Sequence, residues 1–147
     1  MSLDQALLMA NPVSEIAIRL SNKPHALMSE PEKVFWSVTY FVSDTMNGGL
    51  DQSLTNDTGE FMPLFAEFAK RYGTAELTAV VDQISDLFPS GQVPTDREVR
   101  CRLVSEIDHE TIDRLTELFY NCESAIKEGL INMAQANSAK FDLKGSP

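Results

Sequence analysis

The side chains of this sequence best suited to acid–base or metal chemistry are its two histidines. His109 lies four residues before Asp113, and this spacing places both side chains on one face of a helix. Such a pair can bind a metal or transfer a proton, but a metal site needs three or four ligands and no others lie near it in the sequence. His25 follows Pro24 in a predicted turn, where an exposed position is expected. We therefore predict no metal site and no catalytic histidine.

The two cysteines provide a nucleophile only if one of them is activated. Cys101 stands between Arg100 and Arg102, and neighbouring cations favour a reactive thiolate, but the sequence offers no matching base. Cys122 falls on the apolar face of a predicted helix, where a buried and unreactive thiol is expected. The absence of a CxxC motif and of any sign of export predicts free thiols. We expect no enzymatic activity and no cofactor.

The polar segment around the paired glycines invites comparison with known ligand-binding loops. Asp51 begins a stretch that resembles a calcium loop, but Asn56 occupies the position of the required glycine and Met62 that of the bidentate glutamate. Gly48 and Gly49 do not belong to either common phosphate-binding pattern, GxGxxG or GxxxxGK[ST]. The sequence therefore predicts neither calcium binding nor nucleotide binding.

Net charge is the most unusual property of the chain. Its 147 residues include 22 acidic and 12 basic side chains, a net charge of −10, nearly all of it in residues 31–147. Such a chain repels nucleic acid and anionic lipid and attracts basic protein surfaces. No signal peptide is evident, and no apolar run approaches the roughly 20 residues of a membrane span. We expect a soluble, cytoplasmic protein that binds neither nucleic acid nor membranes directly.

Some of the acidic residues are spaced to form an ordered face. Glu110, Asp113 and Glu117 recur at helical intervals and form one row, which Glu106 extends if the preceding turn is continuous. A step of four residues rises about 6 Å, close to the distance between successive phosphates of a nucleic-acid strand, about twice the 3.4 Å helical rise. Together with an i, i+4 pair on the predicted helix 74–88, the candidate partner-binding face comprises Glu106, Glu110, Asp113, Glu117, Asp82 and Asp86. A merely solvated face would show the same pattern, so both interpretations stay open.

The elements that carry these residues are all predicted to be helices. Apolar residues recur at helical intervals along the chain, and no alternating strand pattern is present. The predicted helices cover residues 3–10, 13–20, 29–48, 61–72, 74–88, 95–107, 108–122 and 124–139, and residues 141–147 are expected to fray. We predict a single compact all-α domain, 1–147, of about six to eight helices. Its predicted parts are an N-terminal segment, 1–28, a body, 29–122, and a C-terminal helix and tail, 123–147.

Two of the predicted helices have marked starts. Ser29 and Glu32 form a capping box before a long aromatic helix. That helix is expected to end at the first glycine of an irregular, polar connection over residues 48–59. Thr95 and Glu98 predict a second capping box farther along the chain.

The segment after the aromatic helix carries a specific motif. Its residues are Asn47, Gly48, Gly49, Gln52 and Asn56, and further matches follow at Tyr72-Gly73, Leu87-Phe88-Pro89 and Arg97 to Arg100. The segment resembles a bacterial domain-of-unknown-function family that includes a DNA-mimic protein, over about residues 30–120. Leu50 and Ser53 stand where aromatic residues are usual. The resemblance implies a mainly helical fold and, for the characterised type, an acidic dimer that occupies the DNA-binding surface of a transcription factor or another basic partner.

The motif also has a physical interpretation of its own. Gly48 and Gly49 permit positive φ angles after the helix, while Gln52 and Asn56 can form hydrogen bonds with backbone groups of a loop. We therefore expect the motif to be structural. The alternative is a site in which Asn47, Gln52 and Asn56 surround a small ligand.

Charge, spacing and resemblance together favour a regulatory protein that binds a basic protein partner and competes with DNA for it. An immunity-type protein that neutralises a toxin is the first alternative, and a toxin gene next to this one would favour it. A small-ligand-binding protein or an enzyme built on the motif is the second alternative. A homodimer is implied by the resemblance alone.

Overall fold

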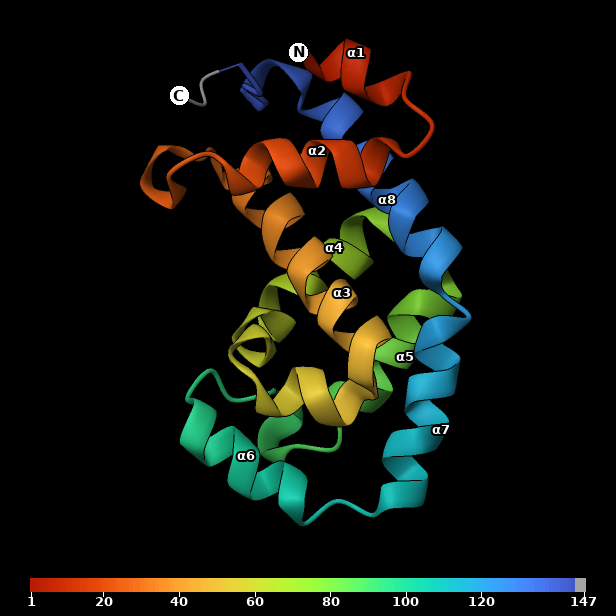
Figure 1. Ribbon diagram of the computed structural model, residues 1–147. Coiled ribbons are helices and arrows are strands. Elements are labelled where there is room, and N and C mark those ends of the chain that lie inside the picture. The colour runs from red at the N-terminus through yellow and green to blue at the C-terminus, as the bar shows by residue number, and fades with distance from the viewer. Residues whose placement is uncertain (145–147) are drawn as a thin grey trace.

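Residues 1–144, which a computed structural model describes, fold into eight α-helices without a β-strand (Figure 1). The helices are α1 (Leu3–Leu7), α2 (Pro12–Ser21), α3 (Glu30–Thr55), α4 (Met62–Tyr72), α5 (Ala75–Ser85), α6 (Arg97–Ser105), α7 (His109–Tyr120) and α8 (Glu123–Ala136). Short 3-10 helices lie at His25–Leu27, Asp57–Phe61, Pro89–Gly91 and Ser138–Lys140. The predicted all-α class and the predicted number of helices are confirmed.

Helix α3 is the centre of the fold. Figure 1 shows it crossing the middle of the molecule, with α1 and α2 near one end and α6 near the other. It packs against α2, α4, α6, α7 and α8, and its Phe35, Val38 and Phe41 side chains are fully buried. Apolar side chains from every helix of residues 1–144 join one buried cluster. No helix in this part of the chain is both long and apolar enough to cross a membrane.

The paired glycines bend α3 instead of ending it. Gly48 has φ −146° and ψ 15°, and Gly49 has φ 79° and ψ 179°, so neither residue is helical. The helix then resumes, with Leu50 and Leu54 buried, and ends only at Thr55. The prediction of an irregular connection that starts at Gly48 is therefore wrong. Burial of the two leucines stabilises a second helical segment beyond the kink.

The two predicted capping boxes have different outcomes. The box at the start of α3 is confirmed, because Glu32 N donates to Ser29 Oγ at 3.3 Å and Ser29 N donates to Glu32 Oε1 at 2.8 Å. The second box is wrong, since α6 is capped by Asp96 rather than Thr95. The Asp96 carboxylate accepts the N–H three residues further on at 2.9 Å, and aspartate caps a helix at least as well as threonine.

The C-terminal tail packs against the helices. Phe141 is buried, and the backbone N–H of Asp142 donates to Glu32 Oε2 at 3.1 Å. The same buried carboxylate accepts Lys23 Nζ at 2.9 and 3.0 Å, so it ties both the tail and the connection before α3 to the start of α3. The prediction that the tail frays from Phe141 is therefore wrong for its described part, and residues 145–147 lie outside that part.

We expect the Gly49→Ala substitution to destabilise the protein. The φ of 79° and ψ of 179° at Gly49 lie in a region that is nearly restricted to glycine, and forcing another residue into it costs about 1–3 kcal/mol. Asn47→Ala is the matched control, because Asn47 is exposed and such surface changes alter stability by less than about 0.5 kcal/mol. Urea unfolding followed by circular dichroism measures both variants. Equal stability of the two would contradict a kink that requires glycine.

Candidate functional site

Helix α7 presents a row of carboxylates to solvent. Its buried stripe consists of Ile112, Leu115 and Phe119. Glu110, Asp113 and Glu117 lie on the opposite face, and all three are exposed. The structure thus places these three acidic residues together on one side of a helix whose other side is fixed in the core. We call them the α7 row.

Neighbouring cations do not neutralise the α7 row. Ion pairs within residues 1–144 join Arg19 to Glu15, Lys23 to Glu32, Lys33 to Glu30, Arg97 to Asp57 and Lys127 to Glu123. Arg114 lies on the same helix as the row, but its Nη1 donates to Gln83 Oε1 of α5 at 3.3 Å. The row therefore presents its negative charges to solvent without a bound counter-cation.

The other three residues of the predicted acidic face do not extend the row. Glu106 caps the C-terminus of α6, and the extended backbone of Asp108, with φ −60° and ψ 132°, separates it from α7. The predicted extension through Glu106 is wrong because the intervening turn is not helical. Asp82 and Asp86 are exposed within and directly after α5, which packs against α7. They form a second acidic group on a neighbouring helix.

The α7 row borders the kink of α3. A hollow of about 380 Å³ between them is lined by Gly48, Gly49, Asp51, Ile112, Asp113, Thr116, Glu117 and Tyr120. The backbone N–H of Leu50 donates to Thr116 Oγ1 at 3.1 Å and so attaches the kink to α7. Asp51 thereby adds a carboxylate to the same hollow as Asp113 and Glu117. Helical spacing within α7 could not predict the position of Asp51. This residue belongs to α3, which is far from α7 in the sequence, and the bend in α3 brings it to the hollow.

The polar residues of the motif converge on Asp44, one turn before the kink. Gln52 Nε2 donates to Asp44 Oδ1 at 2.6 Å, and Asn56 Nδ2 donates to Asp44 Oδ2 at 3.1 Å. Thr58 Oγ1 donates to the same Oδ2 at 2.6 Å. A carboxylate, and not the backbone of a loop, is thus their main partner, which corrects the expectation from sequence. Asn47 does not take part: it is exposed, and its side chain forms no hydrogen bond within the described residues.

These hydrogen bonds set the charge state of Asp44. Burial by itself raises the pKa of the Asp44 carboxyl, but hydrogen bonds from Thr58, Gln52 and Asn56 outweigh burial and hold the pKa below its ordinary value. The carboxylate is therefore stabilised in its charged form by folding. Gly48 contributes space to this arrangement, because a side chain at that position would overlap the side chain of Gln52.

Arg100 of α6 holds the end of α3. Its guanidinium is fully buried and donates to Leu54 O at 2.6 Å and to Asn56 O at 2.7 Å. Its other acceptors are Pro94 O and Thr95 O, both at 3.0 Å. The last carbonyls of a helix have no partner within it, so Arg100 completes the hydrogen bonding of this end. Burial lowers the pKa of the guanidinium, but an arginine stays protonated, and its charge complements the negative end of the helix dipole.

Two further groups of α6 reinforce this junction. Arg97 Nε donates to Thr55 O at 2.9 Å, and Cys101 Sγ donates to the same carbonyl at 3.2 Å. The thiol of Cys101 thus contacts the end of α3, and no basic side chain is hydrogen-bonded to it within the described residues. Gly59 leaves room for the guanidinium, because a side chain there would overlap the Nε of Arg100. We call this arrangement the Arg100 junction.

An open cleft of about 530 Å³ lies beside the motif. Its lining consists of Tyr40, Ser43, Asp44, Asn47, Asn56, Asp57, Thr58 and Arg97. The cation in this cleft, Arg97, is paired with Asp57 at 3.2 Å. The carboxylate of Asp44 already accepts hydrogen bonds from neighbouring side chains. The polar groups around the cleft are thus engaged with one another, and Asn47 is the motif side chain that they leave outside the network.

The remaining candidates for chemistry lie apart from one another. His25 is exposed and meets Trp36 edge-on, with ring centroids 5.8 Å apart. His109 is exposed in the first turn of α7. Cys122 is buried, and burial raises the pKa of its thiol. Residues 1–144 contain no cluster of three side chains able to hold a metal ion.

The model of the family described as DMP19-like protein matches residues 26–137. The chain belongs to the DMP19-like protein family. This is the DNA-mimic family that the motif suggested, so the resemblance is confirmed, and the match extends beyond the motif in both directions to include α7 and all of α8. No curated protein and no solved structure matches the chain.

In this DMP19-like chain we expect Arg100→Met to be strongly destabilising. Methionine fills part of the same space but leaves Leu54 O without its donor, and an unsatisfied buried carbonyl costs about 1–3 kcal/mol. Asn56 O keeps a donor, because Gly59 N also donates to it at 3.1 Å. Arg102→Met is the control, because Arg102 is exposed on the same helix and should change stability by less than about 0.5 kcal/mol. The free energy of unfolding in urea is the measurement. A loss below about 1 kcal/mol for Arg100→Met would mean that the junction does not anchor α3.

The hydrogen bonds at Asp44 predict a specific pH dependence of stability. Because the folded state lowers the pKa of Asp44, its contribution is complete above the unfolded pKa of about 3.9 and is lost as the pH falls through the folded pKa. The difference in unfolding free energy between the wild type and Asp44→Asn should therefore be largest near neutral pH and shrink toward about pH 3. Asp51→Asn, an exposed neighbour, should show no such trend. A constant difference between wild type and Asp44→Asn would contradict the assignment.

Proposed function

We propose that this chain is an acidic regulatory protein that binds a basic protein partner, with the α7 row occupying the positions of DNA phosphates. The observation that carries the proposal is the row itself: three exposed carboxylates on one helix face without a bound counter-cation. Membership of the DMP19-like family supports it, because a DNA mimic belongs to that family. The proposed partner is a DNA-binding protein whose basic surface accepts either DNA or this chain.

The electrostatics of the row favour a binding role over simple solvation. Like charges three and four residues apart repel one another and destabilise a helix. Here Asp113 has acidic neighbours at both spacings, Glu110 and Glu117, and the adjacent Arg114 is engaged with Gln83. Carboxylates on a helix packed into the core also keep their spacing without being ordered at the moment of binding. Such an array suits basic side chains that otherwise contact successive phosphates.

The motif serves this face in our proposal by holding the helices that form it. The hydrogen bond from Leu50 N to Thr116 attaches the kink to α7 between Asp113 and Glu117. Asp44 lies before the kink and Gln52 lies after it, so the hydrogen bond between their side chains joins the two sides. Of the three polar side chains that an enzyme built on this loop would need, Gln52 and Asn56 are thus already bound to Asp44, which supports a structural role for the motif.

The proposal is tested by using the protein as bait in a lysate of its native cell. At about 50 mM salt the bait should retain a DNA-binding protein, and about 200 mM salt should release it, because contacts between charged surfaces weaken steeply over this range. Added duplex DNA should displace the captured protein as well. A captured toxin that DNA does not displace would instead favour the immunity-type alternative.

A matched pair of variants assigns the binding to the row. Glu110→Gln/Glu117→Gln removes two charges from α7 and should weaken capture by about tenfold or more. Asp4→Asn/Glu128→Gln removes two exposed charges from α1 and α8 and should leave capture unchanged. Both variants have the same net charge, so a general electrostatic effect would weaken them equally. That outcome would exclude the α7 row as the binding face.

A further inference from the structure

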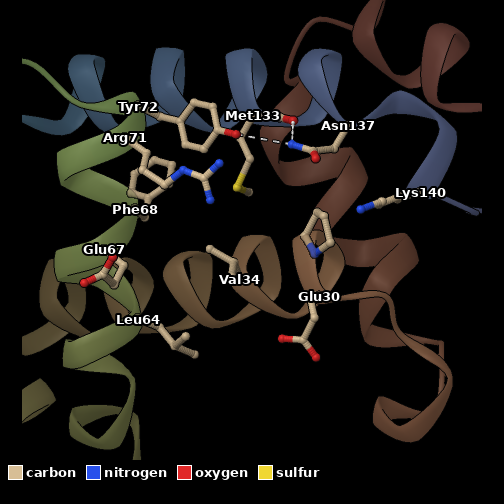
Figure 2. A pocket seen from close by; sticks show the side chains of 11 residues that line it. Glu30, Val34, Leu64, Glu67, Phe68, Arg71, Tyr72, Met133, Asn137 and Lys140 are labelled. Atoms are coloured by element: carbon tan, nitrogen blue, oxygen red, sulfur yellow. Dashed lines mark hydrogen bonds between the residues drawn. The ribbon is translucent and has the colours of Figure 1, made fainter.

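A cavity of about 430 Å³ is bordered by α3, α4, α8 and the following 3-10 helix (Figure 2). Its lining includes Val34, Phe68, Arg71, Tyr72, Met133 and Lys140. The volume falls in the range of small-molecule sites, which extends from about 300 to 1,000 Å³. The cavity shares no residue with the α7 row.

One part of this cavity is apolar. Val34 projects into it from α3, Phe68 from α4 and Met133 from α8 (Figure 2). Phe68 and Met133 are almost fully buried and belong to the core, so these walls are fixed. Gly129 permits the close approach of α8 to α4, because a side chain there would press on Tyr72 O at 2.7 Å. The walls therefore offer a rigid surface for the apolar body of a ligand.

Two cations enter the cavity from different elements. Figure 2 shows the guanidinium of Arg71 pointing inward from α4 and the ammonium of Lys140 pointing toward it from the other side. Neither side chain belongs to an ion pair within residues 1–144. The guanidinium carbon of Arg71 lies 5.7 Å from the centroid of the Tyr72 ring. Ser29 Oγ donates to the backbone carbonyl of Lys140 at 2.7 Å and so fixes the backbone there. Both cations are thus positioned without being neutralised.

A hydroxyl group lies on the same side of the cavity. Tyr72 Oη accepts a hydrogen bond from Asn137 Nδ2 at 3.3 Å, and the same amide donates to Met133 O at 2.9 Å (Figure 2). Among the described residues the hydroxyl proton of Tyr72 has no acceptor. It is therefore available to a group in the cavity, and the amide fixes the direction of the hydroxyl oxygen.

The carboxylates at the rim do not compete for these donors. Glu30 is paired with Lys33 at 3.4 Å. Figure 2 shows the carboxylates of Glu30 and Glu67 both pointing away from the guanidinium of Arg71. The cavity therefore has a positive end beside an apolar wall in a chain whose net charge is −10.

We infer that this cavity binds a small amphipathic anion. Its carboxylate, sulfonate or phosphate group would lie between Arg71 and Lys140 and accept the hydroxyl proton of Tyr72. Its apolar body would cover Val34, against the fixed wall that Phe68 and Met133 form. The long-range field of the acidic chain repels anions, so an anion that binds here does so through these local donors. This selectivity for a negative charge separates the site from a general apolar surface.

The test compares two fluorescent probes that differ by one charge. 8-Anilinonaphthalene-1-sulfonate carries a sulfonate, and N-phenyl-1-naphthylamine is the same aromatic body without it. The sulfonate should bind more tightly than the neutral amine, despite the acidic chain. Amide chemical shifts in nuclear magnetic resonance spectra should change around residues 64–72 and 133–140 on titration with the sulfonate.

Matched variants identify the donors. Arg71→Gln/Lys140→Gln should weaken binding of the sulfonate by about tenfold or more and leave binding of the neutral amine nearly unchanged. Lys70→Gln/Lys144→Gln removes two neighbouring exposed charges outside the cavity lining and should alter neither probe. Absence of sulfonate binding, equal losses in both variants, or shift changes confined to another part of the protein would each overturn the inference. Thermal unfolding of all variants shows whether they remain folded.

Discussion

The arrangement of the helices depends on which groups donate hydrogen bonds to the carbonyls at the end of α3, inside the protein. A helix that ends against other elements leaves carbonyl groups without partners, and the buried guanidinium of Arg100 supplies donors for Leu54 and Asn56. No carboxylate forms an ion pair with this cation within residues 1–144. Its charge is instead stabilised by carbonyl dipoles at the negative end of the helix. This contact joins α6 to α3. Since α3 packs against five helices, of which α6 is one, the contact helps to fix the central helix and the helices around it.

The kink of α3 connects the Arg100 junction to the α7 row. The segment after the kink is attached to α7 by the hydrogen bond from Leu50 N to Thr116. The segment before it is attached to the same helix by Tyr120 Oη, which donates to Thr45 O at 3.2 Å. Helix α7 is thus held from both sides of the bend, and its carboxylates keep a defined direction. A glycine motif distant from α7 in the sequence therefore helps to position an acidic surface to which the motif contributes no charge.

Local patterns predicted most of the fold, and long-range contacts account for the errors. The helix starts and stripes follow from neighbouring residues, so the capping box of Ser29 and the buried face of α7 could be predicted. Glycine marks the end of a helix in a local pattern, but at Gly48 the burial of later leucines continues the helix after a bend. The donors to Asp44 lie 8, 12 and 14 residues away along the chain, outside any helical repeat. Arg100 and its acceptors in α3 are more than 40 residues apart, so no sequence window contains both.

The distribution of partners among the charged residues links stability to recognition. Several basic side chains are used inside the structure: Lys23 holds the buried Glu32, and Arg97 and Arg100 hold the end of α3. Lys23 and Arg97 each pair with a carboxylate, Glu32 and Asp57 respectively, whereas carbonyl groups bind Arg100, so all three cations are engaged away from α7. The same cations that make the fold rigid thereby leave the α7 row uncompensated. The electrostatic field of such a surface attracts basic groups. A site for an anion has to overcome that field with closely spaced donors, as the cavity beside α4 and α8 can. The positions of a few basic side chains therefore affect both the stability of the fold and the charge that its surface presents.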